Sequence, residues 1–385
     1  MLGHIKHIFS AEERHPDYLI LVVTLCLLFV GTVMIYSSST IMAEERFGDS
    51  YHFLKKQFFY ATIGLAAMFV AWRIRYQLLR KVAVAGILLS MVLLVMVFIP
   101  GLGITVNGAS RWIRIAGFTF QVSEFVKLAL ILFLAHFLTK KIEFGRTDFS
   151  KIYAVPIGIT LIIILLILGQ PDFGTSVIFV AILMMLLFLS GMRMVYLVGF
   201  VAALIPAGLY LILCEGYRLK RIFAYLHPWD DPRGAGFHII QSFLCFGSGG
   251  AFGVGLGNSV QKLFYLPEPH TDFIFSIIGE ECGFVGVVFV IALFAVLIVR
   301  GFWISFTMDD TFGSLLAAGI TTMLAIEVTI NIAVVMGMLP TKGLVLPFVS
   351  YGGTSLVMSL TAVGILLNIS GHENVRGEYA VRQAG

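Results

Sequence analysis

Residues 273–300 read FIFSIIGEECGFVGVVFVIALFAVLIVR, and only Glu280, Glu281 and Arg300 are charged within this stretch. An α-helix of about 20 apolar residues is long enough to cross the hydrocarbon core of a bilayer. The stretch therefore predicts a transmembrane helix, and it provides the pattern with which the rest of the chain is read.

Other runs of this character are separated by charged residues and by Gly/Pro clusters. Together they predict an all-α membrane protein, a polytopic bundle of about ten transmembrane helices. The predicted helices lie near residues 17–38, 57–72, 80–99, 121–139, 152–168, 173–191, 195–214, 273–300, 313–338 and 350–370.

The composition of the 385-residue chain supports a membrane protein, because 59% of its residues are hydrophobic and only 12% are charged. Soluble domains carry about 25% charged residues, so this chain lacks the charge to cover a water-facing surface. A basic run with interleaved aromatic residues is missing from the sequence, which argues against nucleic-acid binding. The 4 cysteines form no CxxC pair and no His/Cys cluster, which argues against a disulfide framework or a zinc site.

Lys and Arg residues are concentrated in the loops that would lie on the same side of the membrane as both termini. Because cytoplasmic loops carry an excess of these residues, both termini are predicted to be cytoplasmic. Residues 1–385 then form a single transmembrane domain, with a large extracytoplasmic loop, 215–272, between the seventh and eighth helices. A loop of this length is more often functional than not, and we expect it to carry part of the active site.

Asp272 lies where this loop ends and the eighth span begins, in LPEPHTDFIFSIIGEE. One interpretation is a helix N-cap, a position that Asp and Thr side chains favour. The other is a carboxylate at the boundary between membrane and water, beside His270 and facing an outer cavity, where it can act as a general base. The residues alone leave both interpretations open.

Glu280 and Glu281 lie deeper in the same span. A helical rise of about 1.5 Å per residue places Glu280 about 12 Å below Asp272, whereas the acid/base pair of a glycosidase needs about 5–9.5 Å. We therefore expect the two glutamates to form a structural ion pair or polar network, and a catalytic role is the less favoured alternative.

Two further sets of polar residues lie within predicted spans. Glu124 and Lys127 stand at positions i and i+3 of QVSEFVKLAL, so one helix face can hold them as an ion pair. Glu327 and Asn331 stand at positions i and i+4 of the ninth span. Such groups hold helices together or line a wet interior cavity, and we favour the structural role.

Positive residues are frequent on the predicted outer face, which is normally poor in Lys and Arg. Some of them are expected to extend toward lipid headgroups. Their number nevertheless indicates an anionic ligand, for which a phosphate is the natural candidate. Trp112 belongs to the interfacial aromatic belt or offers a surface on which a sugar stacks. The candidate binding cations are Arg111, Arg218, Lys220, Arg221, Lys262 and Lys342.

Two remaining motifs are read as structural. Residues 247–258, GSGGAFGVGLGN, lack the glycine order of a P-loop or of a dinucleotide-binding fold, so they predict close backbone packing. Asp172, at a tight turn in GQPDFGTS, is most simply a helix cap.

Five stretches of this sequence resemble the SEDS family of shape, elongation, division and sporulation proteins, and the similarity runs over nearly the whole chain. The resemblance is closer to the family's cell-division branch than to its elongation branch in two stretches, GLGNSVQKLFYLPE and LPTKGL. Val122 and Thr354 stand where the family usually has Pro and Ser, and neither replacement removes a charge. The stretches are NGASRWI (107–113), FQVSEFVKL (120–128), GQPDFGTS (169–176), GVGLGNSVQKLFYLPEPHTDFIFSIIGEE (253–281) and LPTKGLVLPFVSYGGTSL (339–356).

The resemblance implies a peptidoglycan glycosyltransferase. Such an enzyme polymerises lipid II, the undecaprenyl-diphosphate-linked disaccharide peptide, into β-1,4-linked glycan at the outer face of the cytoplasmic membrane during septal wall synthesis. The family's essential aspartate falls on Asp272. The implied partners are a class B penicillin-binding protein, which is a transpeptidase, and other membrane proteins of the division complex.

The candidate residues suit this chemistry. A polyprenyl diphosphate is a good leaving group once its charge is neutralised, so one base for the acceptor 4-hydroxyl and cations for the diphosphate are sufficient. Asp272 is the predicted base, with inversion at the donor sugar, and His270 and the cations named above are predicted to contact the substrate. A divalent cation, Mg²⁺ or Mn²⁺, is a further candidate for neutralising the diphosphate, and no metal ligands are assigned.

Two other classes of function remain open. A lipid II flippase would use the polar residues inside the spans, such as Glu124, Lys127, Glu280 and Glu327, as a transport path. A non-enzymatic scaffold of the division machinery would tolerate changes at Asp272. Neither class accounts as well for the charges that cluster on the outer face.

Overall fold

The structure is a computed structural model that describes residues 16–106, 109–115, 118–144, 149–214, 216–234, 236–262 and 269–384. Within these ranges the chain forms twelve α-helices, one 3₁₀ turn and a sheet of three short strands. The predicted all-α polytopic membrane fold is confirmed, since seven of the helices are long and apolar enough to cross a bilayer.

Each predicted span corresponds to one observed helix. Helices α6 and α7 contribute shorter apolar segments, Tyr153–Gly169 and Phe173–Leu189, and α3 carries two lysines near its start. The helices that correspond to the spans are α2 (Tyr18–Phe47), α3 (His52–Arg73), α4 (Tyr76–Met96), α5 (Val122–Phe144), α6 (Phe149–Gly169), α7 (Phe173–Leu189), α8 (Met194–Leu213), α11 (Ile274–Thr307), α12 (Thr311–Val335) and α13 (Gly353–Ala384).

Aspartate side chains begin three of these helices. Asp17, Asp172 and Asp310 are the N-caps of α2, α7 and α12, and each accepts a hydrogen bond from a backbone N–H of the first turn. This bond satisfies one of the amide groups that have no partner within the helix. The predicted capping role of Asp172 is therefore confirmed.

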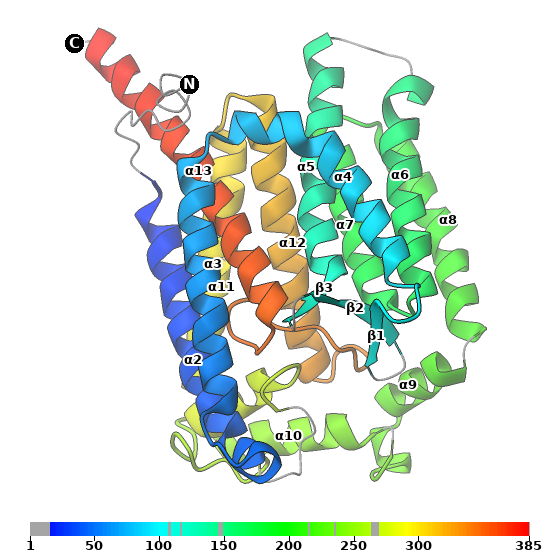
Figure 1. Ribbon diagram of the computed structural model, residues 1–385, viewed down its shortest axis with the longest axis vertical. Helices are drawn as coiled ribbons and strands as arrows, with labels where there is room; N and C mark the ends of the chain where they lie inside the picture. Colours follow the sequence, from blue (N-terminus) through cyan, green and yellow to red (C-terminus); the bar gives the residue numbers. More distant parts are fainter. Residues whose placement is uncertain are drawn as a thin grey trace.

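The helices form a bundle with α5, α12 and α13 in its interior (Figure 1). Two thirds or more of the apolar windows of these three helices are buried, against 6% of the window of α8. Helix α12 packs against α5, α7 and α11. Since lipid is the solvent for exposed apolar side chains in a bilayer, α8 is a peripheral helix and α12 is a central one.

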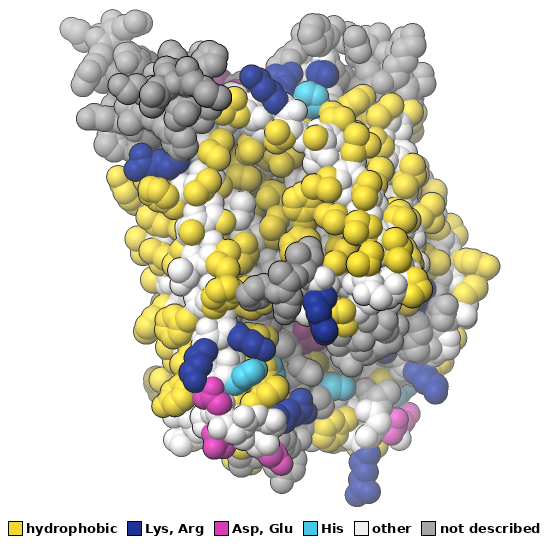
Figure 2. Space-filling view, in the orientation of Figure 1, with side chains coloured by type: hydrophobic (Ala, Val, Ile, Leu, Met, Phe, Trp, Pro, Cys, Tyr) yellow, Lys and Arg dark blue, Asp and Glu magenta, His cyan; other side chains and the backbone are white. Residues whose placement is uncertain are grey.

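The two ends of the bundle differ. Helix α2 begins and α13 ends at one end, whereas the sheet, α9 (Gly216–Leu226), η1 (Pro228–Asp230) and α10 (Phe237–Gly249) lie at the opposite end (Figure 1). Side chains between the two ends form a hydrophobic band, and the charged side chains gather toward the ends (Figure 2). This distribution is the one that a membrane-spanning bundle requires.

The sheet lies between α4 and α5 and consists of β1 (Gly103–Val106), β2 (Ala109–Ile115) and β3 (Phe118–Gln121). The strands are antiparallel in the order β1-β2-β3, and Trp112 pairs with Ile104 on one side and Gln121 on the other. The strands were not predicted, because segments of four to seven residues are too short for an alternating pattern to stand out.

The glycine-rich segment repairs a break in α11. Gly283 has φ 67° and ψ −166°, a conformation that interrupts the helical hydrogen bonds around it. The backbone N–H groups of Val254 and Gly255 donate to the freed carbonyls of Glu280 and Glu281, at 3.0 and 3.1 Å. Backbone polar groups inside a membrane protein must be satisfied by protein, and this segment does so. The close packing predicted for residues 247–258 is therefore present.

A buried ionic triad joins α5 to α12. The ammonium of Lys127 lies 2.8 Å from a carboxylate oxygen of Glu124 and also contacts the carboxylate of Glu327. All three residues are at most 7% exposed. The Glu124–Lys127 ion pair expected from the i, i+3 spacing is thus formed, whereas Glu327 pairs with Lys127 and not with Asn331.

We expect Lys127→Met to destabilise the bundle by about 3–5 kcal/mol, because it leaves two buried carboxyl groups without their counter-charge. The measurement is the denaturant-induced unfolding of purified protein in detergent micelles. Lys55→Met is the matched control, since Lys55 is 69% exposed in its pair with Asp49 and its loss should leave the midpoint nearly unchanged. Equal shifts of the unfolding midpoint for the two changes would contradict a stabilising role of the triad.

Candidate active site

Asp272 is half-buried in the turn that precedes α11, at the end of the bundle where the sheet lies. The N-cap position of α11 falls on Phe273, whose side chain makes no capping hydrogen bond, and Asp272 is the residue before it.

The loop between α12 and α13 runs beside this turn. A Cβ atom added at Gly343 would lie 3.0 Å from Oδ2 of Asp272, so the carboxylate occupies the space that a side chain at position 343 would need. The backbone N–H of Tyr351 donates to the carbonyl of His270, at 2.9 Å, and joins the same two segments at a second point. Asp272 therefore lies directly beside the residue that follows Lys342.

Lys342 and Arg218 of α9 lie over the ring of Phe173 at the start of α7, and Arg221 of α9 contacts the residue before Lys342. The ammonium of Lys342 lies 5.3 Å from the ring centroid, and the guanidinium of Arg218 lies 5.8 Å from it. Arg221 donates to the carbonyl of Thr341, at 3.3 Å. Cations over an aromatic face are attracted by its quadrupole, so Phe173 holds two positive side chains at one point.

Arg111 of β2 completes this group of cations. Its Nε lies 3.3 Å from Oδ2 of Asp172, and its Nη2 donates to the carbonyl of Pro171, at 3.0 Å. Positive groups from β2, α9 and the α12–α13 loop therefore gather at this point. We call Arg111, Arg218, Arg221 and Lys342 the cation cluster.

Burial lowers the pKa of the Lys342 ammonium to about 8. The carboxylate of Asp172 opposes this shift, whereas the guanidinium groups of Arg111 and Arg221 add to it. A lowered lysine pKa is the expected result of desolvation and neighbouring positive charge. A bound anion would relieve both.

Trp112 and Lys220 lie outside the cluster's contacts. Trp112 is half-buried in the middle strand of the sheet. Lys220 is exposed on α9, where its position in the helical repeat differs from the face shared by Arg218 and Arg221. Neither placement tests whether these residues contact a substrate.

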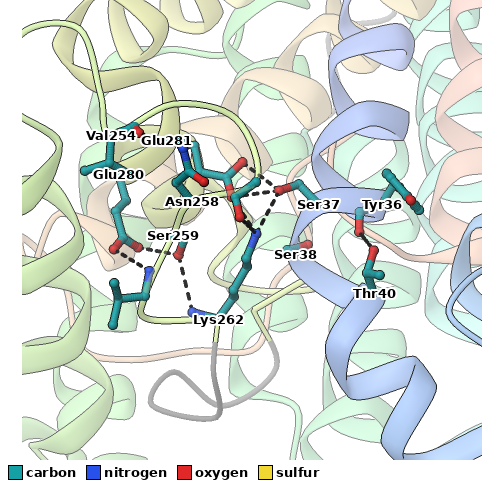
Figure 3. A network of polar contacts seen from close by, with 12 residues as sticks. Tyr36, Ser37, Ser38, Thr40, Val254, Asn258, Ser259, Lys262, Glu280 and Glu281 are labelled. Atoms are coloured by element: carbon teal, nitrogen blue, oxygen red, sulfur yellow. Dashed lines mark hydrogen bonds and ion pairs between the residues drawn. The ribbon is translucent and has the colours of Figure 1, made fainter.

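Lys262, which was predicted to be a diphosphate-binding cation, lies in a buried ion pair away from the contacts of the cation cluster. Lys262 is 6% exposed, and its ammonium lies 3.1 Å from Glu281 and donates to the carbonyl of Gly257 at 2.6 Å. The hydroxyl of Ser37, on α2, donates to the same carboxylate at 2.7 Å (Figure 3). A lysine that is buried and paired in this way offers no free charge to a ligand.

Glu280 has its own partners in this network. Its carboxylate accepts hydrogen bonds from the hydroxyl of Ser259, at 2.5 Å, and from the backbone N–H of Val260, at 3.0 Å (Figure 3). Together with the Lys262–Glu281 pair, these contacts attach residues 257–262 to α11 and α2. The expected structural network is therefore formed by both glutamates.

His270 was predicted to bind substrate, but the structure places it in a buried aromatic group. The residue is 3% exposed, and its ring lies 4.4 Å from that of Phe53 and 5.7 Å from that of Tyr351. Burial lowers its pKa to about 4, and the positive charge of Arg46 adds to this shift. His270 is thus uncharged at neutral pH and packs the turn that carries Asp272 against α3.

Three further residues shape this site and were not predicted from the sequence. Phe173 collects the cations, Gly343 leaves room for the carboxylate of Asp272, and His238 of α10 stacks on Phe273 at 5.6 Å. Each acts through a neighbour that is distant along the chain. A single sequence contains no signal for such contacts.

A family model described as a cell cycle protein, FtsW/RodA/SpoVE, matches residues 17–375. The chain is 48% identical over 371 residues to the probable peptidoglycan glycosyltransferase FtsW of Trichlorobacter lovleyi, covering 96% of both proteins. It is 44% identical over 361 residues to the stage V sporulation protein E of Bacillus subtilis, covering 94% of this chain and 98% of that protein.

Solved structures share the fold. One is described as "Structural coordination of polymerization and crosslinking by a peptidoglycan synthase complex", with a TM-score of 0.76 and 29% identity over 93% of this chain and 98% of that chain. The crystal structure of the rod shape determining protein RodA of Thermus thermophilus has a TM-score of 0.70 and 26% identity over 94% of this chain and 98% of that chain.

The affinity of the cation cluster for inorganic diphosphate should fall as the pH rises through about 8. Lys342 is protonated below this pH and loses its charge above it. Lys342→Arg keeps its charge throughout and should reduce the fall, while the titration of diphosphate itself is common to both proteins. Calorimetric titration of both proteins across this pH gives the comparison, and identical profiles would contradict a role for Lys342 in anion binding.

Proposed function

The chain belongs to the FtsW/RodA/SpoVE family of cell cycle proteins, the SEDS family, and from this we propose that it is a peptidoglycan glycosyltransferase that polymerises lipid II during septal wall synthesis. The chain is a multi-pass membrane protein. The relatives that carry this activity in their names match almost the whole length of the chain, so the proposal concerns the complete transmembrane bundle.

One observation of the structure carries the proposal furthest. The carboxylate of Asp272 lies against Gly343, and the next residue along the chain, Lys342, belongs to the cation cluster. A potential base and a group of cations therefore meet at one end of a hydrophobic bundle. A lipid-linked diphosphate sugar presents the complementary features, which are an anionic diphosphate, a nearby sugar and an apolar tail.

The reaction follows from this arrangement. Asp272 accepts the proton of the acceptor's 4-hydroxyl as the oxygen attacks the anomeric carbon of the donor sugar. The bond between that carbon and the diphosphate oxygen breaks, and the polyprenyl diphosphate leaves with the electron pair. Attack opposite the leaving group inverts the α-linked donor to a β-1,4 linkage.

The cation cluster supplies the second requirement. Negative charge builds up on the diphosphate oxygens as the bond breaks, and positive side chains that are already in place stabilise it. Arginine binds phosphate oxygens through its planar fork of donors, whereas lysine acts as a point charge. A separate acid is unnecessary, because a neutralised diphosphate leaves without protonation.

Among the described residues, no group of three or more His, Cys, Asp or Glu side chains could hold a metal ion by itself. A divalent cation carried by the diphosphate needs only one or two carboxylates and stays a candidate for sharing the neutralisation. Of the two aspartates described at this site, Asp172 and Asp272, the first is paired with Arg111. We assign the neutralisation of the diphosphate by the protein to the cation cluster.

We place the site at the extracytoplasmic face, with both termini in the cytoplasm, as the distribution of Lys and Arg indicates. Lipid II carries its sugars on that face, where the new strand is needed. A class B penicillin-binding protein is the partner we propose. The related structure described as a peptidoglycan synthase complex, in which polymerization and crosslinking are coordinated, supports such a pairing.

Asp272→Asn should abolish polymerisation of lipid II, because an amide cannot accept the hydroxyl proton. The assay combines the purified chain, its transpeptidase and lipid II in proteoliposomes, and the products are separated on a gel. Asp309→Asn, an exposed change between α11 and α12, is the control and should give normal glycan ladders. Normal ladders from a folded Asp272→Asn protein would refute the proposal.

The same proteoliposomes, together with a growth assay, distinguish a glycosyltransferase from a flippase and from a scaffold. A flippase would move fluorescent lipid II across the bilayer without forming polymer. A scaffold would form no polymer, and Asp272→Asn would support growth of the host cell as well as the wild type does.

A further inference from the structure

Asn331 joins the two segments that carry the reactive groups. It lies one turn beyond Glu327 on α12 and is 2% exposed. Its side-chain nitrogen donates to the backbone carbonyl of Asp272, at 3.1 Å, and to the backbone carbonyl of Leu344, at 2.5 Å. One amide group therefore contacts both the turn that carries Asp272 and the loop that carries Lys342.

We propose that Asn331 is a positioning residue that sets the distance between the base, Asp272, and the diphosphate-binding Lys342. This inference rests on the proposed glycosyltransferase activity. Asn331 touches no reacting atom in this account, and it acts through the two backbone segments that it holds.

The geometry of the amide makes the tie specific. A primary amide nitrogen has two hydrogens in a fixed plane, and each can bond one carbonyl. With both bonds formed at ordinary lengths, the two carbonyl oxygens are held about 5 Å apart. Leu344 lies two residues from Lys342, so the separation of the Asp272 and Leu344 carbonyls also sets the position of Lys342 relative to Asp272.

The support for Asn331 is rigid. Helix α12 is packed among α5, α7 and α11, and the Glu327–Lys127 contact attaches it to α5 one turn away from Asn331. The two segments that Asn331 holds are a turn and an irregular loop, outside the regular helices. A site built on a regular element is placed more accurately than one built on loops alone.

A second hydrogen bond between the two segments acts together with the Asn331 contacts. The hydrogen bond from Tyr351 to the carbonyl of His270 also joins the two segments. A single tie allows one segment to rotate about the other, whereas two ties fix their relative orientation. The Asn331 contacts are the ones nearer to Asp272 and Lys342 along the chain.

Loss of the amide should affect turnover more than binding. The cation cluster would remain, so the substrate would still bind through its diphosphate. The base would no longer be held at the acceptor hydroxyl, and a misplacement of about 1 Å can cost about 100-fold in rate. A residue with a merely stabilising role would not separate these two quantities.

The test is Asn331→Leu, which keeps the size of the side chain and removes its donor. The full chain with its transpeptidase is assayed in proteoliposomes over a range of lipid II concentrations. We expect the maximal rate to fall at least about tenfold, while the half-saturating concentration changes less than about threefold. Wild type and Asp272→Asn are run beside it.

Asn368→Leu is the matched control. Asn368 is also fully buried, accepts a hydrogen bond from the backbone N–H of Tyr76 at 2.9 Å and donates to the carbonyl of Trp72. It holds the end of α3 to the start of α4, at the opposite end of the bundle (Figure 1). The control should lower the unfolding midpoint as Asn331→Leu does, and its maximal rate should stay within about twofold of wild type.

Two results would overturn the inference. One is a maximal rate of folded Asn331→Leu within twofold of wild type, and the other is an equal loss of rate in Asn368→Leu. If Asn331→Leu does not fold, Asn331→Ser, which can donate to one carbonyl, decides by the same comparison, with an expected fall of at least about threefold. An active Asp272→Asn protein would instead refute the proposed function.

Discussion

The approach of Gly343 to the carboxylate of Asp272 is the contact on which the site depends. The turn before α11 and the loop between α12 and α13 are about 70 residues apart in sequence, yet they lie side by side. A Cβ atom at position 343 would lie 3.0 Å from this carboxylate, so a side chain there would require the carboxylate to shift. The approach also places Lys342, and with it the cation cluster, next to the candidate base.

Buried charge connects the elements around this approach. Two ionic networks carry it, the triad of Glu124, Lys127 and Glu327 and the pair of Lys262 with Glu281. Isolated charges at such depth are costly, and they are tolerated here because each is paired within the protein. The triad connects α5 with the helix that carries Asn331, and the Lys262–Glu281 pair connects the chain on one side of Asp272 with α11 on the other.

Hydropathy was sufficient to predict the transmembrane helices, because the length and apolar character of each span are properties of a continuous segment. The prediction of Asp272 as a base drew on its place at a span boundary, and the structure is compatible with it. Lys262 and His270 were assigned to substrate binding because their charge and position in the chain suggested it. Their actual partners, Glu281 for the lysine and Phe53 with Tyr351 for the histidine, are brought to them only by the fold. The same limit explains why Asn331 was paired with Glu327 on its own helix, when its contacts lie on two other segments.

In this mechanism the cation cluster binds the diphosphate of lipid II, and Asp272 accepts the proton in the chemical step. Equilibrium binding of lipid II tests this separation of roles most directly. Wild type, Asp272→Asn and Lys342→Met are compared in the same nanodiscs with a fluorescent lipid II. The account predicts that Asp272→Asn binds with a Kd within about threefold of wild type, and that Lys342→Met binds at least about tenfold more weakly. Weakened binding by Asp272→Asn together with unchanged binding by Lys342→Met would contradict it.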